Sequence, residues 1–415
     1  MRVTYLDQLF RTPEMYGITR SYEMARRLVK SGHQVQVVTS WSEPTEKKGW
    51  FVTTEDGVTV HWYVCPYSNN MGIVRRLLSF FVFLVAALHR AQNLPADIVF
   101  ASSVPLTIAI PGAFAAWRQH VPMVLEVRDL WPEIPIAIGA LPGPILKALA
   151  RALERFAYRS SARIVAASPG MRDGISAAGY PSGKISVIPN SADIDLFGGK
   201  NADATRLLAL HPELKGRKIV LYAGTFGRIN GVQYLVDVAA RSQAQSSPTA
   251  FVAVGEGAEF EAVRSLSRAK GVLDSNLFIY PPIPKLEIPH AFAAATITLS
   301  LFINLKEMWN NSANKFFDGL AAARPVAINY LGWQADLIRK EDVGVVLPHS
   351  DPVAAADLIN ARLADAAWLE GASQRARRLA ETHFSRDKLA KELEGVLLAA
   401  VQKRQAPVRP RAADE

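Results

Sequence analysis

The sequence contains two separate series in which short apolar segments alternate with amphipathic ones. The first series starts at Val3–Leu6, continues through the helical spacing of Thr19–Ser31 and returns to an apolar run at Gln34–Thr39. The second starts at Lys218–Ala223 and continues through Gly231–Arg241, which is helix-like. Because strand, helix and strand in this order favour a parallel sheet, we predict an α/β protein with two Rossmann-like domains.

Further apolar runs extend both series and are expected to be strands. Those in the first half are Val58–Tyr63, Ile98–Phe100, Met123–Val127, Ile164–Ala167 and Ile185–Ile188. Those in the second half are Ala250–Val254, Leu277–Ile279, Ile297–Leu301 and Val326–Ile328.

The two series give the expected domain boundaries. The first domain should cover residues 1–195 and the second residues 196–385, with a last helix at Arg386–Gln402 that returns to the first domain. Residues 403–415 are basic and rich in proline, and we expect a flexible tail there. Ligands of open parallel sheets lie beyond the carboxyl ends of the strands, so two such domains predict a binding cleft between them.

The formal net charge of +9 favours anionic partners, namely nucleic acid, an acidic membrane surface or phosphorylated ligands. No long basic tract or zinc-knuckle spacing supports nucleic acid. Cys65 is the single cysteine, which excludes an internal disulfide and fits a reducing compartment, and we expect its side chain to be buried. The first residues lack the apolar core of a signal peptide, so we expect a cytoplasmic or peripheral protein of undetermined oligomeric state.

One segment suggests contact with a membrane. Val74–Arg90 is apolar between a basic start, Arg75 and Arg76, and a basic end. It is shorter than the ~20 residues that span a bilayer, and it could lie in the interface with Phe80 and Phe81 in lipid. Its apolar residues surround the helix, however, so a buried helix is the alternative. Pro135–Leu153 is a second apolar and basic segment of this kind.

The segment Asn310–Ala327 is the most informative one for function. Asn310 or Ser312 could cap a helix, whose first amides and dipole would then bind an anion. Lys315 adds a positive charge, and Asp318 could accept hydrogen bonds from ribose hydroxyls. The alternative is an ordinary capped helix with a Lys–Asp pair.

Glycine loops follow the first strand of each series. Gly17 follows Val3–Leu6, and Gly224 and Gly227 follow Lys218–Ala223. Neither loop matches the G-x-G-x-x-G or P-loop pattern, which argues against a standard dinucleotide or NTPase site. Arg228 could reach a phosphate, or it could be a solvated loop arginine.

Charged residues also follow the predicted strand Met123–Val127. Asp129 would lie at the cleft and could contact a reacting sugar, or it could be a turn residue paired with Arg128. Glu126 lies within the strand and is expected to be structural. The histidines are scattered and no Asp-x-Asp is present, so we expect no metal site and no cofactor.

Taken together, these segments resemble the family-4 retaining glycosyltransferases of the GT-B fold. Within that family the resemblance is to the bacterial surface-polysaccharide branch with the WbuB-type N-acetylfucosaminyltransferases. The segments that carry it, in family order, are TRSYEMARRLVKSGHQVQVVTS (19–40), VRDLWPEIPIAIGAL (127–141), LERFAYRSSARIVAASPGM (153–171), LYAGTFG (221–227), VGEG (254–257) and NKFFDGLAAARPVA (314–327).

The resemblance implies metal-independent transfer with retention from a nucleotide sugar, usually a UDP-sugar. It implies an acceptor on the N-terminal domain, often a polyprenyl-diphosphate-linked sugar at the inner face of the cytoplasmic membrane. Arg128, Asp129 and Asn310 would be catalytic, and Trp131 would contact the acceptor or the membrane. The remaining donor-binding positions would be Gly17, Gly224, Thr225, Arg228, Gly255, Asn311, Ser312, Ala313, Asn314, Lys315 and Asp318.

The chain departs from the family pattern at several of these positions. Asn310 stands for the first Glu of the family's E-x7-E pair, and Arg128 for a histidine. Thr225 and Asn230 stand for the two cations of the phosphate loop. These departures motivate an alternative function, a sugar-nucleotide-binding assembly factor. A sugar-nucleotide epimerase shares the fold but needs catalytic carboxylates and histidines that the pattern does not place.

Overall fold

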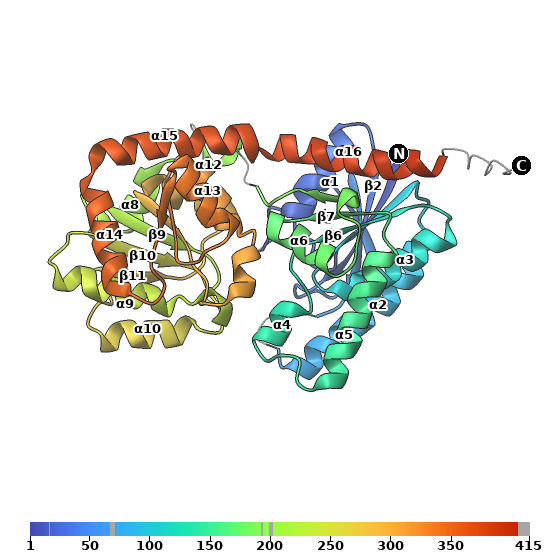
Figure 1. The fold of residues 1–415 in the computed structure, drawn as a ribbon, viewed down its shortest axis with the longest axis horizontal. Helices are drawn as coiled ribbons and strands as arrows, with labels where there is room; N and C mark the ends of the chain where they lie inside the picture. Colours follow the sequence, from blue (N-terminus) through green and yellow to red (C-terminus); the bar gives the residue numbers. More distant parts are fainter. Residues whose placement is uncertain (16, 67–70, 192–193, 199–201, 406–415) are drawn as a thin grey trace, which may run out of the picture.

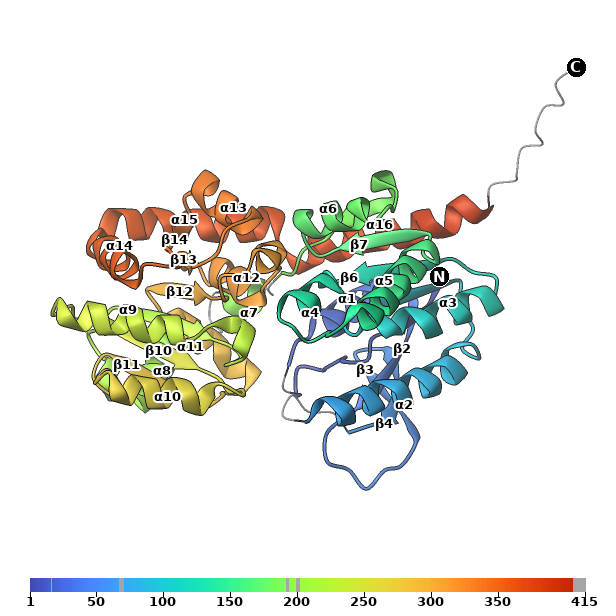
Figure 2. The same cartoon turned by 60° about the horizontal axis from the view of Figure 1, so that its bottom comes forward.

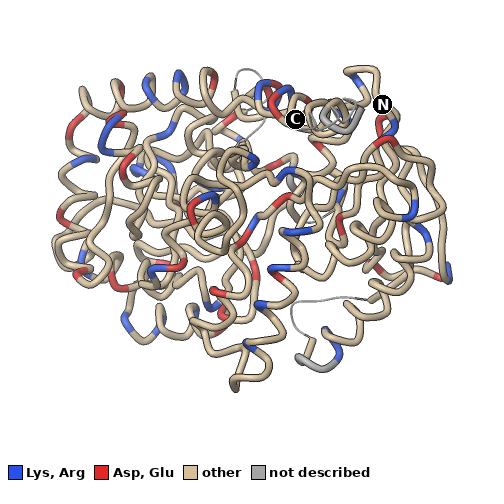
Figure 3. The backbone as a smooth tube through the Cα atoms, turned by 45° about the vertical axis from the view of Figure 1, so that its right-hand side comes forward, with Lys and Arg blue, Asp and Glu red and all other residues tan. Residues whose placement is uncertain are grey.

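The computed structural model describes residues 1–15, 17–66, 71–191, 194–198 and 202–405. These residues form two α/β units, each built on its own sheet, with the N-terminal unit at one end of the molecule and the C-terminal unit at the other (Figure 1). Basic and acidic residues are interleaved over both units (Figure 3). The two-domain α/β architecture predicted from the alternating segments is confirmed.

Within the described residues, the N-terminal sheet has eight strands in the order β3-β4-β2-β1-β5-β6-β7-β8, and only the β3–β4 pair is antiparallel. The strands are β1 (Arg2–Leu6), β2 (Gln34–Trp41), β3 (Trp50–Glu55), β4 (Val58–Val64), β5 (Ile98–Ser102), β6 (Met123–Val127), β7 (Arg163–Ala166) and β8 (Ile185–Val187). Strand β3 was not predicted. It forms a hairpin through Asp56 and Gly57, which both have positive φ, as a two-residue type I′ turn requires.

Helices cover both faces of this sheet. They are α1 (Arg20–Lys30), α2 (Ile73–Ala91), α3 (Ala109–Arg118), α4 (Glu133–Ala137), α5 (Pro144–Arg159) and α6 (Pro169–Ala177), with short 3-10 turns η1 (Leu106–Ile108) and η2 (Ser182–Lys184). Helices α2, α3 and α5 share one core with the sheet, which contains Phe83, Ala115 and Ala157. Cys65 is buried in the same core, as predicted.

The C-terminal sheet, in the part of the chain that the structure describes, has six parallel strands in the order β11-β10-β9-β12-β13-β14. The strands are β9 (Ile219–Ala223), β10 (Ala250–Val254), β11 (Leu277–Tyr280), β12 (Ile297–Ser300), β13 (Val326–Ile328) and β14 (Gly344–Val346). Its helices are α7 (Ile194–Phe197), α8 (Ala204–Leu210), α9 (Gln233–Ala244), α10 (Phe260–Ala269), α11 (Ile288–Ala294), α12 (Asn314–Ala321), α13 (Trp333–Glu341), α14 (Pro352–Ala364) and α15 (Ala366–His383). The 3-10 turns are η4 (Pro212–Leu214), η5 (Arg228–Asn230), η6 (Lys285–Glu287) and η7 (Lys306–Asn310).

The last helix, α16 (Arg386–Gln405), follows α15 and runs back across the N-terminal domain (Figure 2). Leu389, Leu393 and Leu397 of α16 are buried in the same core as Tyr22 and Leu28 of α1, so the crossing is held by apolar packing. The helix extends to Gln405, so residues 403–405 are helical and do not belong to a tail. The rest of the expected tail, residues 406–415, lies outside the described residues.

Helix α2 is apolar on two sides. Phe83 and Ala87 face the core, whereas Leu77, Leu78, Phe81, Val82 and Val85 are exposed and share the opposite side at helical spacing. The alternative of a wholly buried helix is therefore wrong. No helix in the described part of the chain is long and apolar enough to cross a bilayer.

Candidate functional site

The carboxyl ends of the two sheets meet around the loop that follows β12. That loop contains η7 and ends at α12, and α4 and α6 of the N-terminal domain both contact η7. Helices α4 and α6 follow β6 and β7, so they begin at the carboxyl edge of their own sheet. This junction is where ligands of open parallel sheets bind, and it brings together most of the predicted site residues.

On the C-terminal side, two glycine loops and a lysine lie in close contact. A Cβ atom added to Gly224, after β9, would lie 2.5 Å from Cε of Lys315. A Cβ atom added to Gly255, after β10, would lie 1.9 Å from the carbonyl oxygen of Gly224. Only glycine fits at position 255, where a side chain would meet backbone, whereas a side chain at position 224 would displace the end of Lys315. The lysine side chain therefore lies directly on the glycine loop.

The ammonium group of Lys315 lies against aromatic rings. Its Nζ is 5.2 Å from the ring centroid of Tyr222 and 5.7 Å from that of Phe302, within the range of cation–π contacts. Burial against this packing lowers the pKa of Lys315 to about 8, and the nearby Asp318 carboxylate opposes the shift. Lys315 and Asp318 are thus neighbours, as their spacing on one helix predicted.

The start of α12 differs from the predicted cap. Ala313 occupies the N-cap position, and no side chain of the described residues caps the helix. Asn311 lies just before it, donates to the carbonyl oxygen of Met308 at 2.6 Å and accepts from the Ala313 amide at 3.0 Å. The cap assigned to Asn310 or Ser312 is therefore wrong, and the amides of Asn314 and Lys315 begin the helix without a side-chain acceptor.

Asn310 and Ser312 instead face the N-terminal domain. The Ser168 hydroxyl donates to the Asn310 carbonyl oxygen at 2.6 Å, and the Asn190 amide donates to Ser312 Oγ at 2.9 Å. The Asn190 side chain also donates to the Ser312 carbonyl oxygen. A Cβ atom on Gly170 would lie 2.0 Å from Oδ1 of Asn310, so this side chain is packed against α6.

Ser168 and Asn190 were missed by the sequence reasoning. Ser168 is the N-cap of α6, where its hydroxyl also accepts from the Met171 amide at 3.0 Å, and the Ser-Pro pair that opens α6 is a recognisable helix start. Nothing in the sequence indicates that the same hydroxyl reaches a loop 142 residues away.

The remaining donor-side residues lie in the loop after β9. Thr225 and Arg228 are exposed, and Arg228 forms no ion pair with a described residue. Asn230 is buried under this loop at 7% exposure, and its Oδ1 would be 3.0 Å from a Cβ on Gly227. Asn230 therefore packs the loop and does not replace a phosphate-binding cation, whereas Arg228 is free to do so.

On the N-terminal side, Arg128 and Asp129 follow β6 as expected. Arg128 lies near Asp7, with 3.7 Å between its Nη1 and Oδ2 of the carboxylate, so its close partner is Asp7, from the end of β1. Asp129 is exposed, but the protein atoms around its carboxylate take the place of part of the water. This desolvation raises the pKa of Asp129 to about 6, and Arg128 opposes the rise.

A buried ion pair lies beneath these residues. Nη2 of Arg20 is 2.8 Å from Oε1 of Glu126, and both side chains are almost inaccessible to water. Arg20 also donates to the carbonyl oxygens of Ile188 at 2.9 Å and Pro189 at 2.7 Å. Burial raises the pKa of Glu126, but Arg20, Arg128 and Ser102 outweigh this effect and hold the pKa below its ordinary value. The expected structural role of Glu126 thus includes anchoring the chain just before Asn190.

Other predicted residues lie on the N-terminal domain away from these contacts. Gly17, in the loop after β1, has φ +132°. Trp131 packs on the core beside α4. Arg75, Arg76, Phe80 and Phe81 belong to α2, with Phe81 at 62% exposure. In the described part of the chain, no three His, Cys, Asp or Glu side chains gather as a metal site.

The geometry can bind an anionic ligand between the domains. Lys315, the glycine loops and the uncapped amides of α12 supply positive charge and close backbone approach, and Asp129 supplies a carboxylate from the other domain. The molecule thus has two Rossmann-like domains that meet at the loop between β12 and α12, and a last helix that crosses back to the first domain. This arrangement defines the GT-B class of glycosyltransferase.

Comparisons with known proteins agree with this class. Residues 17–191 match the model of the glycosyl transferase 4-like domain, and residues 217–365 match that of the glycosyl transferases group 1. WcaI of Escherichia coli (strain K12), named as a colanic acid biosynthesis glycosyl transferase, is 24% identical over 66% of this chain and 72% of its own. The glycosyltransferase WbjE of Pseudomonas aeruginosa is 25% identical over 71% and 74%.

The fold also matches that of a solved structure. Anabaena HepE in complex with UDP and glucose superposes with a TM-score of 0.72 at 14% identity, over 96% of this chain and all of HepE. With both domain models matched in order over most of its length, the chain belongs to the family-4 glycosyltransferases of the GT-B fold. It is a glycosyltransferase, as the resemblance of its motifs implied.

Proposed function

We propose that the protein is a retaining glycosyltransferase that moves a sugar from a UDP-sugar to a lipid-linked or other saccharide acceptor. The observation that carries the proposal is Lys315, held on Gly224 beside the uncapped start of α12. A nucleotide diphosphate is the leaving group that such a site stabilises, because its negative charge develops where the lysine and amides lie. Support for UDP comes from HepE, and support for polysaccharide biosynthesis from the name of WcaI.

The remaining residues take roles around this diphosphate. Asp318 accepts hydrogen bonds from the ribose, and Arg228 adds a second cation from the loop after β9. Because these cations and the helix amides neutralise the leaving group, transfer proceeds without a metal ion, in a hexosyl- or N-acetylhexosaminyltransferase. Asp129 and Arg128 orient the acceptor. The attacking hydroxyl of the acceptor approaches the donor sugar from the same face that the diphosphate leaves, and an oxygen of the diphosphate accepts the proton of this hydroxyl.

The acceptor reaches the enzyme at the inner face of the cytoplasmic membrane. The exposed apolar side of α2, with Leu77, Phe81 and Val85, inserts at the interface of an anionic bilayer, and Arg75 contacts its head groups. A peripheral enzyme placed in this way can use an acceptor that is anchored by a polyprenyl chain. The transferred sugar becomes part of a bacterial surface polysaccharide.

The test is turnover by the purified protein. A panel of UDP-sugars is incubated with polyprenyl-diphosphate-linked saccharides, with and without a metal chelator, and the anomeric configuration of the product is read by NMR. We expect one donor to be used with retention, unaffected by the chelator. Lys315→Met should abolish donor binding, whereas the exposed Lys340→Met should not. Donor binding without transfer to any acceptor would overturn the proposal in favour of a binding-only assembly factor.

A further inference from the structure

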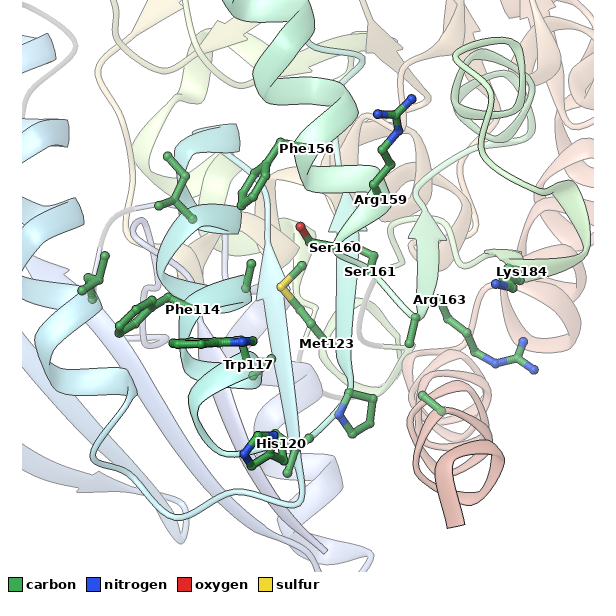
Figure 4. A pocket seen from close by; sticks show the side chains of 18 residues that line it. Phe114, Trp117, His120, Met123, Phe156, Arg159, Ser160, Ser161, Arg163 and Lys184 are labelled. Carbon is green, nitrogen blue, oxygen red and sulfur yellow. The ribbon is translucent and has the colours of Figure 1, made fainter. Parts of the chain in front are cut away.

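A large groove lies at the end of the N-terminal sheet opposite the domain junction. It has a volume of about 860 Å³ and runs between α3 and α5 (Figure 4). Met123 and Arg163, which line it, begin β6 and β7, whereas Arg128 and Ser168 of the candidate site follow the other ends of these strands. The groove is therefore separate from the site of sugar transfer.

One part of the groove is apolar and aromatic. Phe114 and Trp117 of α3 lie with ring centroids 5.7 Å apart, and Phe156 of α5 and Met123 of β6 also line it (Figure 4). Trp117 is nevertheless 67% exposed, an unusual position for so large an aromatic side chain. This part suits a hydrocarbon chain.

The other part of the groove is basic. Arg163 and Lys184 lie together on the side away from Phe114, and Arg159 also lines the groove, near Phe156, with its side chain pointing away from these two (Figure 4). No aspartate or glutamate is among the lining residues, and none of these three cations forms an ion pair with a described carboxylate. Unpaired cations at one end and aromatic rings at the other match an amphiphile with an anionic head.

The groove is continuous with the exposed apolar surface of the same domain. Of the seventeen large hydrophobic side chains exposed in the described residues, ten lie on α2, α3 and α5. Helix α3 contacts both α2 and α5, and the three helices lie side by side in Figures 1 and 2. An occupant of the groove would thus extend from a surface that is itself suited to lipid.

We propose that this groove binds one anionic phospholipid of the bilayer. Its acyl chains lie against Phe114, Trp117 and Phe156, and its phosphate contacts Arg163 and Lys184, while Arg159 adds positive charge at the rim. The apolar side of α2 alone would leave the domain free to rotate about the axis of that helix. A lipid bound in the groove adds a second point of attachment and so fixes the orientation of the N-terminal domain on the membrane. The inference does not depend on which donor or acceptor the enzyme uses.

The experiment uses short-chain lipids that stay monomeric, so that a site is distinguished from adsorption to a surface. Dihexanoyl phosphatidylglycerol and dihexanoyl phosphatidylcholine are titrated into the full-length protein by calorimetry. We expect saturable binding of the phosphatidylglycerol and at least about tenfold weaker binding of the zwitterionic lipid. Equal affinity for the two lipids, or no saturable binding, would overturn the proposal.

Variants locate the site. The triple substitution Arg159→Ala, Arg163→Ala and Lys184→Ala should weaken phosphatidylglycerol binding at least about tenfold. The matched triple Lys215→Ala, Arg264→Ala and Arg268→Ala removes the same charges from exposed positions of the C-terminal domain and should leave binding within twofold.

Two single substitutions keep the test decisive if the triple variant fails to fold. Arg159→Glu reverses an exposed rim charge and should weaken phosphatidylglycerol selectively, whereas Trp117→Ala should weaken both lipids. UDP binding should be unchanged in each, which separates a failed lipid site from a failed enzyme assignment. If polyprenyl phosphate displaces phosphatidylglycerol at equal concentration, the groove belongs to the acceptor's lipid and the proposal is wrong.

Discussion

Lys315 makes donor binding dependent on pH in a range where ordinary lysines do not titrate. Burial lowers the pKa of its ammonium group to about 8, from the ordinary lysine value of 10.5. The charge that a diphosphate needs is therefore partly lost within the working range of the enzyme. The perturbation is a change of pH from 7 to 9, and the quantity measured is the Kd for UDP.

The magnitude follows from the protonated fraction. With a pKa of about 8, roughly nine-tenths of the protein carries the charge at pH 7 and roughly one-eleventh at pH 9. If UDP binds only the protonated form, its Kd should rise about tenfold between these pH values, which corresponds to ~1.4 kcal/mol. Binding should also take up a proton at pH 9, because the diphosphate restores the charge.

Calorimetry in two buffers of different ionisation enthalpy measures both the Kd and the proton uptake. Lys315→Arg keeps its charge at every pH used and should remove the lysine-dependent part of the slope. Lys315→Met should show no measurable UDP binding at either pH. A wild-type Kd that is equal at pH 7 and pH 9, or a Lys315→Arg slope as steep as the wild-type one, would refute the assignment of this lysine to the diphosphate.

The same shift has a stability consequence of definite sign. The folded pKa lies below the unfolded one, so the unfolded chain binds more protons between about pH 8 and 10.5, and stability should rise with pH across that interval. At pH 7 the buried charge costs up to ~3 kcal/mol. Lys315→Met should therefore be more stable than the wild type at pH 7 while it loses donor binding, which separates function from folding.

The alternating apolar runs predicted the fold because the central strands of both sheets are buried on two faces. β5, β6 and β10 are buried at every position and read as continuous apolar runs. Two strands escaped this reasoning. β3 is an edge strand that is partly exposed throughout, and β14 has three residues that begin with a glycine. Neither offers a run long enough to be distinguished from a loop.

The sequence predicted those contacts of the candidate site that form within one helix, but not those between residues far apart in the chain. The spacing of Lys315 and Asp318 on one helix fixes their proximity. The partners of Asn310 and Ser312 come instead from Ser168 and Asn190, more than a hundred residues earlier in the chain, and no periodicity encodes that pairing. The sequence predicts both polar residues as helix caps because it shows only the hydrogen bonds that they can make locally.

Three further perturbations test the N-terminal half of the site and the segment that joins the domains. Because desolvation raises the pKa of Asp129 to about 6, activity that needs its carboxylate should increase through pH 6, and Asp129→Asn should lose this limb of the pH profile of kcat/KM. Asn190→Ala removes the side-chain hydrogen bond to the Ser312 carbonyl oxygen but keeps the backbone amide that donates to Ser312 Oγ, so it should lower the free energy of unfolding by about 1 kcal/mol in urea titrations. Its kcat should fall although the protein remains folded in the assay. Arg20→Ala leaves Glu126 charged and buried, and should cost about 3–5 kcal/mol in the same urea titration. The double variant Arg20→Met and Glu126→Leu should recover much of the lost free energy of unfolding, because neither charge of the buried ion pair remains. The double variant should still impair turnover, since Arg20 no longer donates to the carbonyl oxygens before Asn190. A single Arg20→Ala substitution that costs less than about 1 kcal/mol would contradict the buried-pair argument, and full turnover by the double variant would show that the joining segment needs no such anchor.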